Sequence, residues 1–186
     1  RRKKTVKAFY GLTCGGMKSS RLNPFAKIHL YKMYCRPILY YGVENLKLKK
    51  YEILALQRLE ASIIKRICHL PKRTRNTDLL NAVRMEKVND KLDLIKIKFF
   101  ERLAKNEYTR TVVQKLLNIY GMEETHLVEK SQSLVIEIKK ITKSDDNDLD
   151  VLLSKCKLAK ENIIKSIKTE RNDERLESIR YAINKV

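Results

Sequence analysis

The chain has 186 residues, a net charge of +19 at pH 7, and only five glycines and three prolines. This length suits one domain, or one domain with an appendage, and the scarcity of helix breakers among many Leu, Ile and Lys predicts an all-α protein. No stretch approaches the roughly 20 apolar residues of a membrane span, and no apolar run follows the basic start as in a signal peptide. We therefore expect an intracellular protein, nuclear or cytoplasmic, without membrane contact. The chain does not begin with Met, and we expect it to be a fragment.

The positive charge is concentrated in the first part of the chain. Residues 1–75 hold 19 lysines and arginines against three acids, a net charge of +16, whereas residues 76–186 hold 22 against 19, a net charge of +3. A strong positive field confined to one region indicates a polyanionic partner, most often nucleic acid. The alternative is a basic surface that is simply well solvated.

The first predicted elements are two helices separated by a glycine break. Residues 5–12 resemble the end of a helix, and Gly15-Gly16 interrupts it. Asn23 is a good N-cap and Pro24 suits the first helical position, so a second helix starts there. Its apolar residues occupy a wide face, which predicts a central helix packed between residues 5–12 and 50–70.

A positive stripe and a proline mark this central helix. His29, Lys32 and Arg36 follow at spacings of three and four, which places them on one face. Pro37 lacks an N–H and disfavours helical dihedrals at the residue before it, so we expect a kink at Arg36 and a short final segment ending at Gly42.

The next helix, residues 50–70, ends in a basic segment. Pro71 stops it, and the loop that follows contains Lys72, Arg73 and Arg75. Together with Lys65 and Arg66 these cations place a basic helix end next to a basic loop, an arrangement suited to a phosphate backbone. The alternative is a solvated face with a basic surface loop.

Two further helices complete the first predicted domain, residues 1–121. One spans residues 89–105 and the other residues 107–121. In the first of them, a spacing of three, four and four predicts core positions at Leu92, Ile95, Phe99 and Leu103. The fold expected for this domain is an irregular multi-helix bundle.

Residues 122–186 have a different character and form a predicted helical extension. Their apolar stripes are narrow and their charge is mixed, which suits helix packing on each other, on a protein partner or on a second copy of the chain. An acidic run lies near residues 143–150. Asp145 and Asp146 could be proposed as a metal pair, but they lack a third carboxylate, and an acidic linker with an N-cap is the preferred interpretation.

The sequence contains no recognisable catalytic, cofactor or metal site. The four cysteines, Cys14, Cys35, Cys68 and Cys156, lack the spacing of a zinc site, and we expect them to be reduced and structural. There is no GxGxxG or GxxxxGKS phosphate loop. We expect no cofactor, no metal and no small-molecule ligand.

Several segments share the order of residues of a known family. The run from Leu30 to Glu44, LYKMYCRPILYYGVE, resembles the Leu-Tyr…Pro-x-Leu-x-Tyr-Gly-x-Glu segment of non-LTR (LINE-like) retrotransposon reverse transcriptases. Further similar segments follow in order at residues 56–60, 64–67, 72–75 and 98–103. The resemblance covers roughly residues 1–110.

This resemblance implies a helical thumb that grips a template–primer duplex behind a catalytic palm. The family's palm carboxylates lie upstream of this segment and are absent here, so we expect no polymerase activity from this chain alone. The resulting hypothesis is a thumb-like fragment that binds RNA or DNA backbone. The predicted contacts are Lys65, Arg66, Lys72, Arg73 and Arg75, then His29, Lys32, Arg36, Arg1, Arg2, Lys3 and Lys4. The alternatives are a protein-interaction module carried by residues 122–186 and a degenerate retroelement remnant without function.

Overall fold

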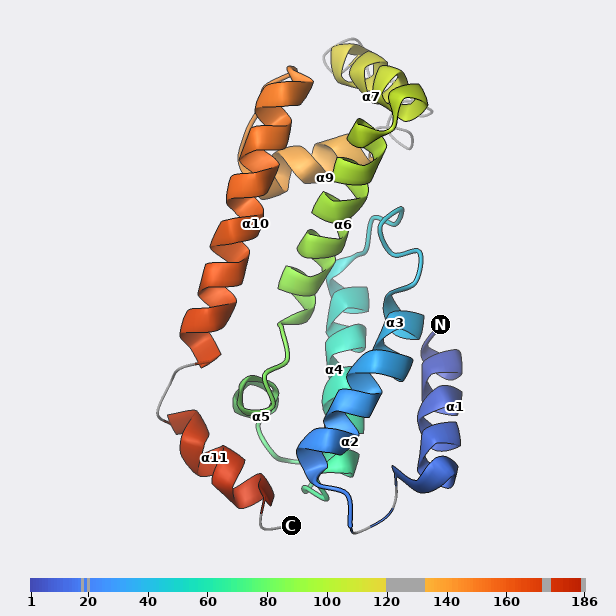
Figure 1. Cartoon of the computed structure of the whole chain (residues 1–186), viewed down its shortest axis with the longest axis vertical. Helices are drawn as coiled ribbons and strands as arrows, with labels where there is room; N and C mark the ends of the chain where they lie inside the picture. Colours follow the sequence, from blue (N-terminus) through green and yellow to red (C-terminus); the bar gives the residue numbers. More distant parts are fainter. Residues whose placement is uncertain (18, 20, 120–132, 172–174, 185–186) are drawn as a thin grey trace. The chain divides into compact units, whose positions relative to one another are not determined.

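The computed structural model describes residues 1–17, 19, 21–119, 133–171 and 175–184, and Figure 1 shows their arrangement into helices. No strand occurs within these ranges, so the predicted all-α class is confirmed. The end of the helix predicted for residues 107–121 and the start of the extension predicted for residues 122–186 lie outside the described residues.

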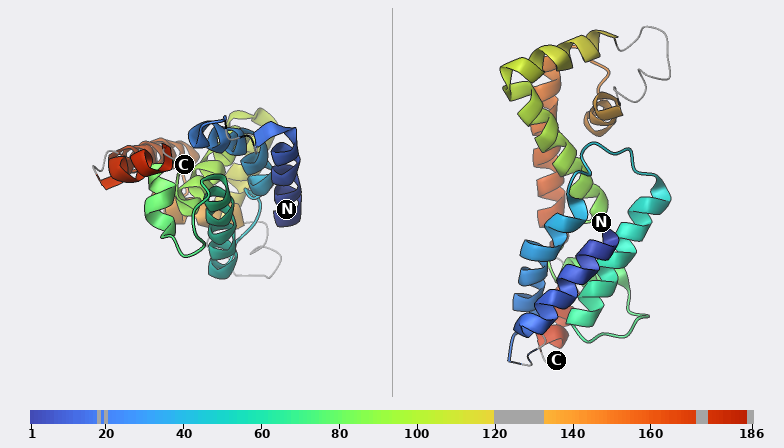
Figure 2. Two further views of the ribbon diagram at one scale, coloured as in Figure 1. Left: turned by 90° about the horizontal axis from the view of Figure 1, so that it is seen from below. Right: turned by 90° about the vertical axis from the view of Figure 1, so that its right-hand side faces the viewer.

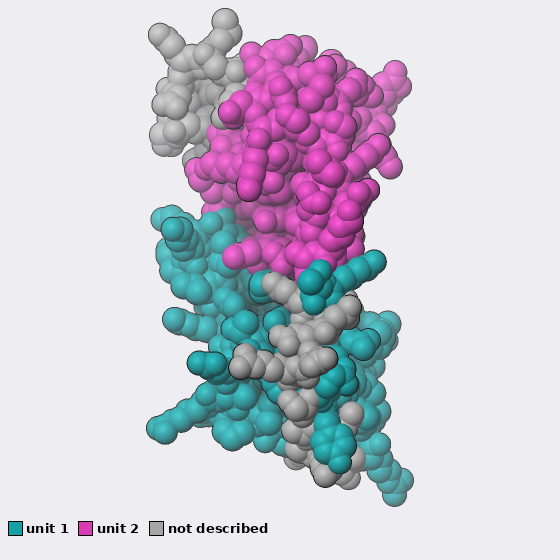
Figure 3. Space-filling model, turned by 90° about the vertical axis from the view of Figure 1, so that its left-hand side faces the viewer, with its two compact units in different colours: residues 1–41, 48–88, 167–186 teal, residues 42–47, 89–166 magenta. Residues whose placement is uncertain are grey.

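The chain divides into two compact units (Figure 3). Unit 1 contains residues 1–41, 48–88 and 167–186, and unit 2 contains residues 42–47 and 89–166. This division differs from the predicted boundary after residue 121. The reason is that core packing joins segments far apart in the chain: Val113 belongs to the core of unit 2, and Leu176 and Ile183 belong to the core of unit 1.

Unit 1 contains eight short helical segments within its described residues. They are α1 (Arg2–Leu12), η1 (Thr13–Met17), α2 (Pro24–Leu30), η2 (Tyr31–Cys35), α3 (Arg36–Tyr40), α4 (Lys50–Ile67), α5 (Asn76–Ala82) and α11 (Arg175–Asn184). The break predicted at the glycine pair is present, because Gly16 adopts φ 106°, a conformation that favours glycine. At the end of α4, His69 adopts φ 51° and the chain then reaches Pro71.

The central helix begins where the sequence predicts. The Asn23 side chain accepts a hydrogen bond from the backbone N–H of Phe25 at 2.8 Å, and Pro24 occupies the first turn. The predicted departure of Arg36 from helical dihedrals is wrong, since Arg36 has φ −63° and ψ −41°. The helix adapts one turn earlier, in the π-helical η2, where the Arg36 N–H bonds to the Tyr31 carbonyl five residues back. A π-turn changes the local hydrogen-bond register, so the helix continues through the proline to Tyr40.

The core of unit 1 lies against this central helix. α1 contacts η2 and α3, and α4 contacts α2, which agrees with a helix packed between two neighbours. Ile28, Tyr31 and Cys35 fill the middle of the core at 0–1% exposure. α4 adds Ile63, Ile64 and Ile67, and α11 contributes Leu176 and Ile183. The C-terminal helix therefore packs within unit 1, where it contacts α5 and α2.

Within its described residues, unit 2 contains four helices. They are α6 (Val88–Lys105), α7 (Glu107–Ile119), α9 (Ser133–Thr142) and α10 (Leu149–Arg171), whose last residues belong to unit 1. In α6, Leu92 is buried as predicted, whereas the predicted core residues Ile95, Phe99 and Leu103 are only partly buried. In the second half of the helix the buried residues are Ile97, Phe100 and Ala104, so the buried face there differs from the predicted one.

All four cysteines are free thiols, as predicted. Cys35, Cys68 and Cys156 are buried, as structural cysteines are, whereas Cys14 is exposed, so the structural role predicted for Cys14 is wrong. Burial raises the pKa of Cys68 and of Cys156 to about 11, so these thiols remain protonated at neutral pH and are chemically inert.

Candidate nucleic-acid interface

The cations at the start of helix α1 are all exposed to solvent, whereas two other residues of the helix lie in the core. Thr5 and Phe9 are buried, and this fixes the rotation of the helix. The exposed cations are Arg1, Arg2, Lys3, Lys4 and Lys7. Four of them were predicted contacts. Lys7 was missed, although its position three residues after Lys4 could have identified it.

The outer face of α1 borders a shallow hollow of about 510 Å³. Its lining residues are Arg2, Lys3, Val6, Lys7 and Tyr10. Three of these five side chains are cations and none is an acid. The hollow can therefore accept an anionic group, and it has an aromatic ring at one end of its lining.

Tyr10 connects α1 to the basic end of α4. The Arg66 guanidinium carbon lies 5.8 Å from the centroid of the Tyr10 ring, and its Nη1 donates a hydrogen bond to the Tyr10 hydroxyl. The two helices run in the same direction along this side of unit 1 (Figure 2, right). The contact joins two residues that are 56 apart in the sequence and so brings the basic end of α4 next to α1.

The loop after α4 presents the remaining predicted cations. Lys72, Arg73 and Arg75 are all exposed. The loop is held in place by a turn, in which the backbone N–H and hydroxyl of Thr74 both donate to the Pro71 carbonyl, at 3.1 and 2.8 Å. Lys65 stabilises this geometry, because its Nζ donates to the Lys72 carbonyl at 2.8 Å. Lys65 thus positions the loop and is less available for a ligand than its neighbours.

The stripe predicted on the central helix is divided by tertiary contacts, and Arg36 is not part of any interface. Its side chain is 6% exposed, and its Nε lies 2.8 Å from a carboxylate oxygen of Glu60, which is 0% exposed. A second ion pair joins it to Glu86. The prediction was wrong for Arg36 because helical periodicity does not show which side of a helix other segments cover.

The other two members of the stripe have separate environments. Lys32 donates from Nζ to the carbonyls of Val83 and Arg84, at 2.9 and 3.0 Å, and so stabilises the end of α5. A cation at this place interacts favourably with the carbonyls at a helix C-terminus. His29 is exposed. His29, Lys32 and Arg36 therefore do not form one exposed stripe.

Few acids oppose the cations of residues 1–75. Of the three acids there, Glu60 is buried against Arg36 and Glu52 accepts the backbone N–H of Lys49 at 2.8 Å, where it closes the first turn of α4. Glu44, the third, lies in the segment that groups with unit 2. Most of the 19 cations of residues 1–75 are therefore not matched by an acid of the same segment.

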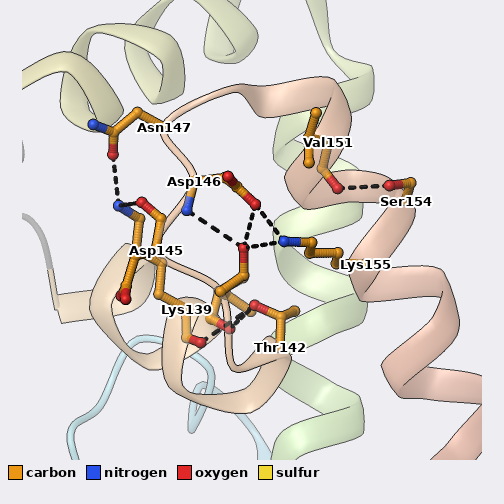
Figure 4. Close-up of polar contacts among 10 residues, drawn as sticks. Lys139, Thr142, Asp145, Asp146, Asn147, Val151, Ser154 and Lys155 are labelled. Carbon is orange, nitrogen blue, oxygen red and sulfur yellow. Dashed lines mark hydrogen bonds and ion pairs between the residues drawn. The ribbon is translucent and has the colours of Figure 1, made fainter.

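The acidic run of unit 2 forms a local hydrogen-bond network and not a metal pair (Figure 4). Asp146 pairs with Lys155 and accepts from the Ser144 hydroxyl at 2.7 Å. Hydrogen bonds from Lys155 and Ser144 lower the pKa of Asp146. The Asp148 side chain accepts the Asp150 N–H at 3.0 Å, as an N-cap of α10 does.

Within the described ranges, no group of three or more His, Cys, Asp or Glu side chains is arranged to hold a metal ion. No helix there has both the length and the apolar character needed to cross a membrane.

Comparison with known proteins returned no match among protein-family models, curated proteins or solved structures.

Proposed function

We propose that this chain binds the phosphate backbone of nucleic acid through one basic surface of unit 1. We define the basic surface as Arg1, Arg2, Lys3, Lys4 and Lys7 of α1, Arg66 of α4, and Lys72, Arg73 and Arg75 of the following loop. The observation that carries the proposal is the Tyr10–Arg66 contact, which joins two groups of exposed cations from distant segments. The resemblance of residues 30–44 to non-LTR retrotransposon reverse transcriptases suggests the more specific role of a thumb-like fragment that grips a template–primer duplex.

The mechanism is electrostatic and independent of base sequence. Cations that neutralise phosphates release the counterions condensed on the nucleic acid, so the affinity falls steeply with salt. If five of the nine cations contact phosphates, the affinity falls by about 500-fold between about 50 and 200 mM salt. Backbone contacts of this kind position the ligand without reading its sequence.

The test compares the full chain with a loop variant, Lys72→Gln/Arg73→Gln/Arg75→Gln, in fluorescence anisotropy with a labelled RNA–DNA hybrid. The variant should bind more weakly, and the slope of log affinity against log salt should become shallower by about 2 to 3, because each phosphate contact contributes about 0.9. A control variant, Lys115→Gln/Lys140→Gln/Lys157→Gln, removes the same charge from exposed positions of unit 2. Equal losses of affinity in both variants would mean that only net charge matters, and this would refute the assignment of binding to the basic surface. Salt-independent binding of the wild type would refute the mechanism.

One of the apolar stripes that suggested a protein-interaction module is buried inside unit 1. Leu176 and Ile183, from the last of the narrow stripes, are 4% and 1% exposed in the core of unit 1. Arg180 of the same helix donates to the Ala82 carbonyl at 3.0 Å. This stripe is therefore used inside the chain, and nucleic-acid binding is the function that the exposed residues favour.

A further inference from the structure

Tyr10 is an exposed aromatic ring that two neighbours hold in place. Its exposed fraction is 48%. The ring of Phe9 lies 5.6 Å away between centroids at an interplanar angle of 59°, and Phe9 is itself buried. Arg66 contacts both the ring and the hydroxyl of Tyr10. A half-exposed tyrosine fixed by a core residue and a guanidinium loses little freedom when a ligand binds to it.

The hollow beside this ring has the composition of a nucleotide site. Arg2, Lys3 and Lys7 supply positive charge, and Val6 and the Tyr10 ring supply apolar surface. All five lining residues come from α1, so the hollow is an open surface on which a strand can lie. Cations next to an exposed aromatic ring are the combination by which proteins bind single strands, since bases stack on the ring and phosphates lie on the cations.

We propose that Tyr10 is a stacking platform for one unpaired base of a single-stranded nucleic acid, whose flanking phosphates lie on Arg2, Lys3 and Lys7. This inference rests on the proposed nucleic-acid binding and specifies the ligand at the α1 end of the basic surface. Bases inside a duplex are stacked on each other and cannot reach the ring. Tyr10 therefore contributes to affinity only for a single strand or for an unpaired extension of a duplex.

The first experiment separates stacking from charge. The full chain is titrated with a labelled oligonucleotide and with an abasic strand of the same length, which carries the same phosphates, and the ratio of the two affinities is measured. Tyr10→Ala should lower this ratio by about five- to hundredfold, the contribution of one stacked base. Tyr10→Phe retains the ring and should leave the ratio within about twofold of wild type. The matched control is Tyr108→Ala, which removes an 87% exposed tyrosine from unit 2 and should leave the ratio unchanged.

The second experiment does not depend on affinity differences. The chain contains no tryptophan, so a Tyr10→Trp variant has a single indole whose fluorescence reports on position 10 alone. The base-containing strand should quench this fluorescence at saturation, and the abasic strand should not. Equal quenching by both strands, or a base-to-abasic ratio that Tyr10→Ala leaves unchanged, would overturn the stacking site.

The two proposals fail in different ways. One outcome is that Tyr10→Ala leaves the base-to-abasic ratio unchanged while the loop variant still makes the salt slope of hybrid binding shallower. In that case the basic surface binds nucleic acid as proposed, and the stacking site is wrong. If the wild-type chain binds neither the hybrid nor either single strand at low salt, the proposed function is wrong and the stacking site is refuted with it.

Discussion

Replacing Arg36 with methionine should destabilise unit 1 strongly without weakening its binding to nucleic acid. The substitution leaves Glu60, which is 0% exposed, without the guanidinium that lies 2.8 Å from its carboxylate. Removing one partner of a buried ion pair costs about 3 to 5 kcal/mol. Glu60→Gln should cost less, about 2 kcal/mol, because Arg36 still pairs with Glu86. The double variant Arg36→Met/Glu60→Gln should lose less stability than the sum of the two single losses, since no buried charge is then left without its partner.

The loss in Arg36→Met should also depend on pH. Burial raises the pKa of Glu60, and the attraction of Arg36 partly opposes this effect. Without Arg36 the pKa of the folded state rises further, whereas the unfolded chain ionises near a pKa of about 4.3. A raised folded-state pKa contributes stability that is complete below the unfolded pKa and is lost as pH rises through the folded one. The free energy of unfolding of the variant should therefore approach that of wild type in mild acid. As the pH rises from there, the difference should grow by up to about 1.4 kcal/mol per pH unit.

The assay is urea unfolding followed by far-ultraviolet circular dichroism for wild type, both single variants and the double variant at several pH values. Hybrid binding is measured in parallel under conditions where each variant is folded. A loss in Arg36→Met below about 1 kcal/mol at neutral pH, the size expected of an exposed pair, would refute the burial of this charge. If Arg36→Met made the salt slope of hybrid binding as shallow as the loop variant does, Arg36 would have to be a phosphate contact.

Two further predictions follow from the cores and the thiols. Leu176→Ala and Ile183→Ala should each lower the free energy of unfolding by about 2 to 5 kcal/mol in urea titrations, because α11 completes the core of unit 1. The control is Leu158→Ala, at a position that is 58% exposed. A similar loss in the control would contradict the burial of Leu176 and Ile183 in this core. With a thiol-reactive chromogenic reagent, Cys14 should react in the native protein while Cys35, Cys68 and Cys156 react only after unfolding. A second thiol as fast as Cys14 would be inconsistent with their burial.

Helix positions were predictable because the signals that start and end helices are local. Asn23 and Pro24 begin the central helix where expected. The helix predicted for residues 50–70 is α4, Lys50–Ile67, and the one predicted for residues 89–105 is α6, Val88–Lys105. The backbone hydrogen bonds concerned join residues within about one turn, so the sequence contains both partners of each bond.

Helix faces were less predictable when two neighbouring faces are both apolar. In α6, Phe99 and Phe100 are adjacent and either could have faced the core. Phe100 is buried at 0% exposure, because it packs with Leu152 and Cys156 of α10, which lies about 50 residues further along the chain. Pro37 presented a related difficulty: its missing hydrogen bond was foreseen, but the π-turn that accommodates it was not.

The sequence by itself determined that this protein is helical and that its positive charge lies in residues 1–75, since helix propensity and formal charge are properties of the residues themselves. Only the tertiary structure decided which cations remain in solvent. The sequence does not distinguish Arg36 from Arg66. In the fold, Arg36 is buried and paired with Glu60 and Glu86, which are 24 and 50 residues away. Arg66 instead joins Tyr10 at the surface. Burial depends on segments that meet only when the chain folds, so the candidate interface could be defined only from the folded protein.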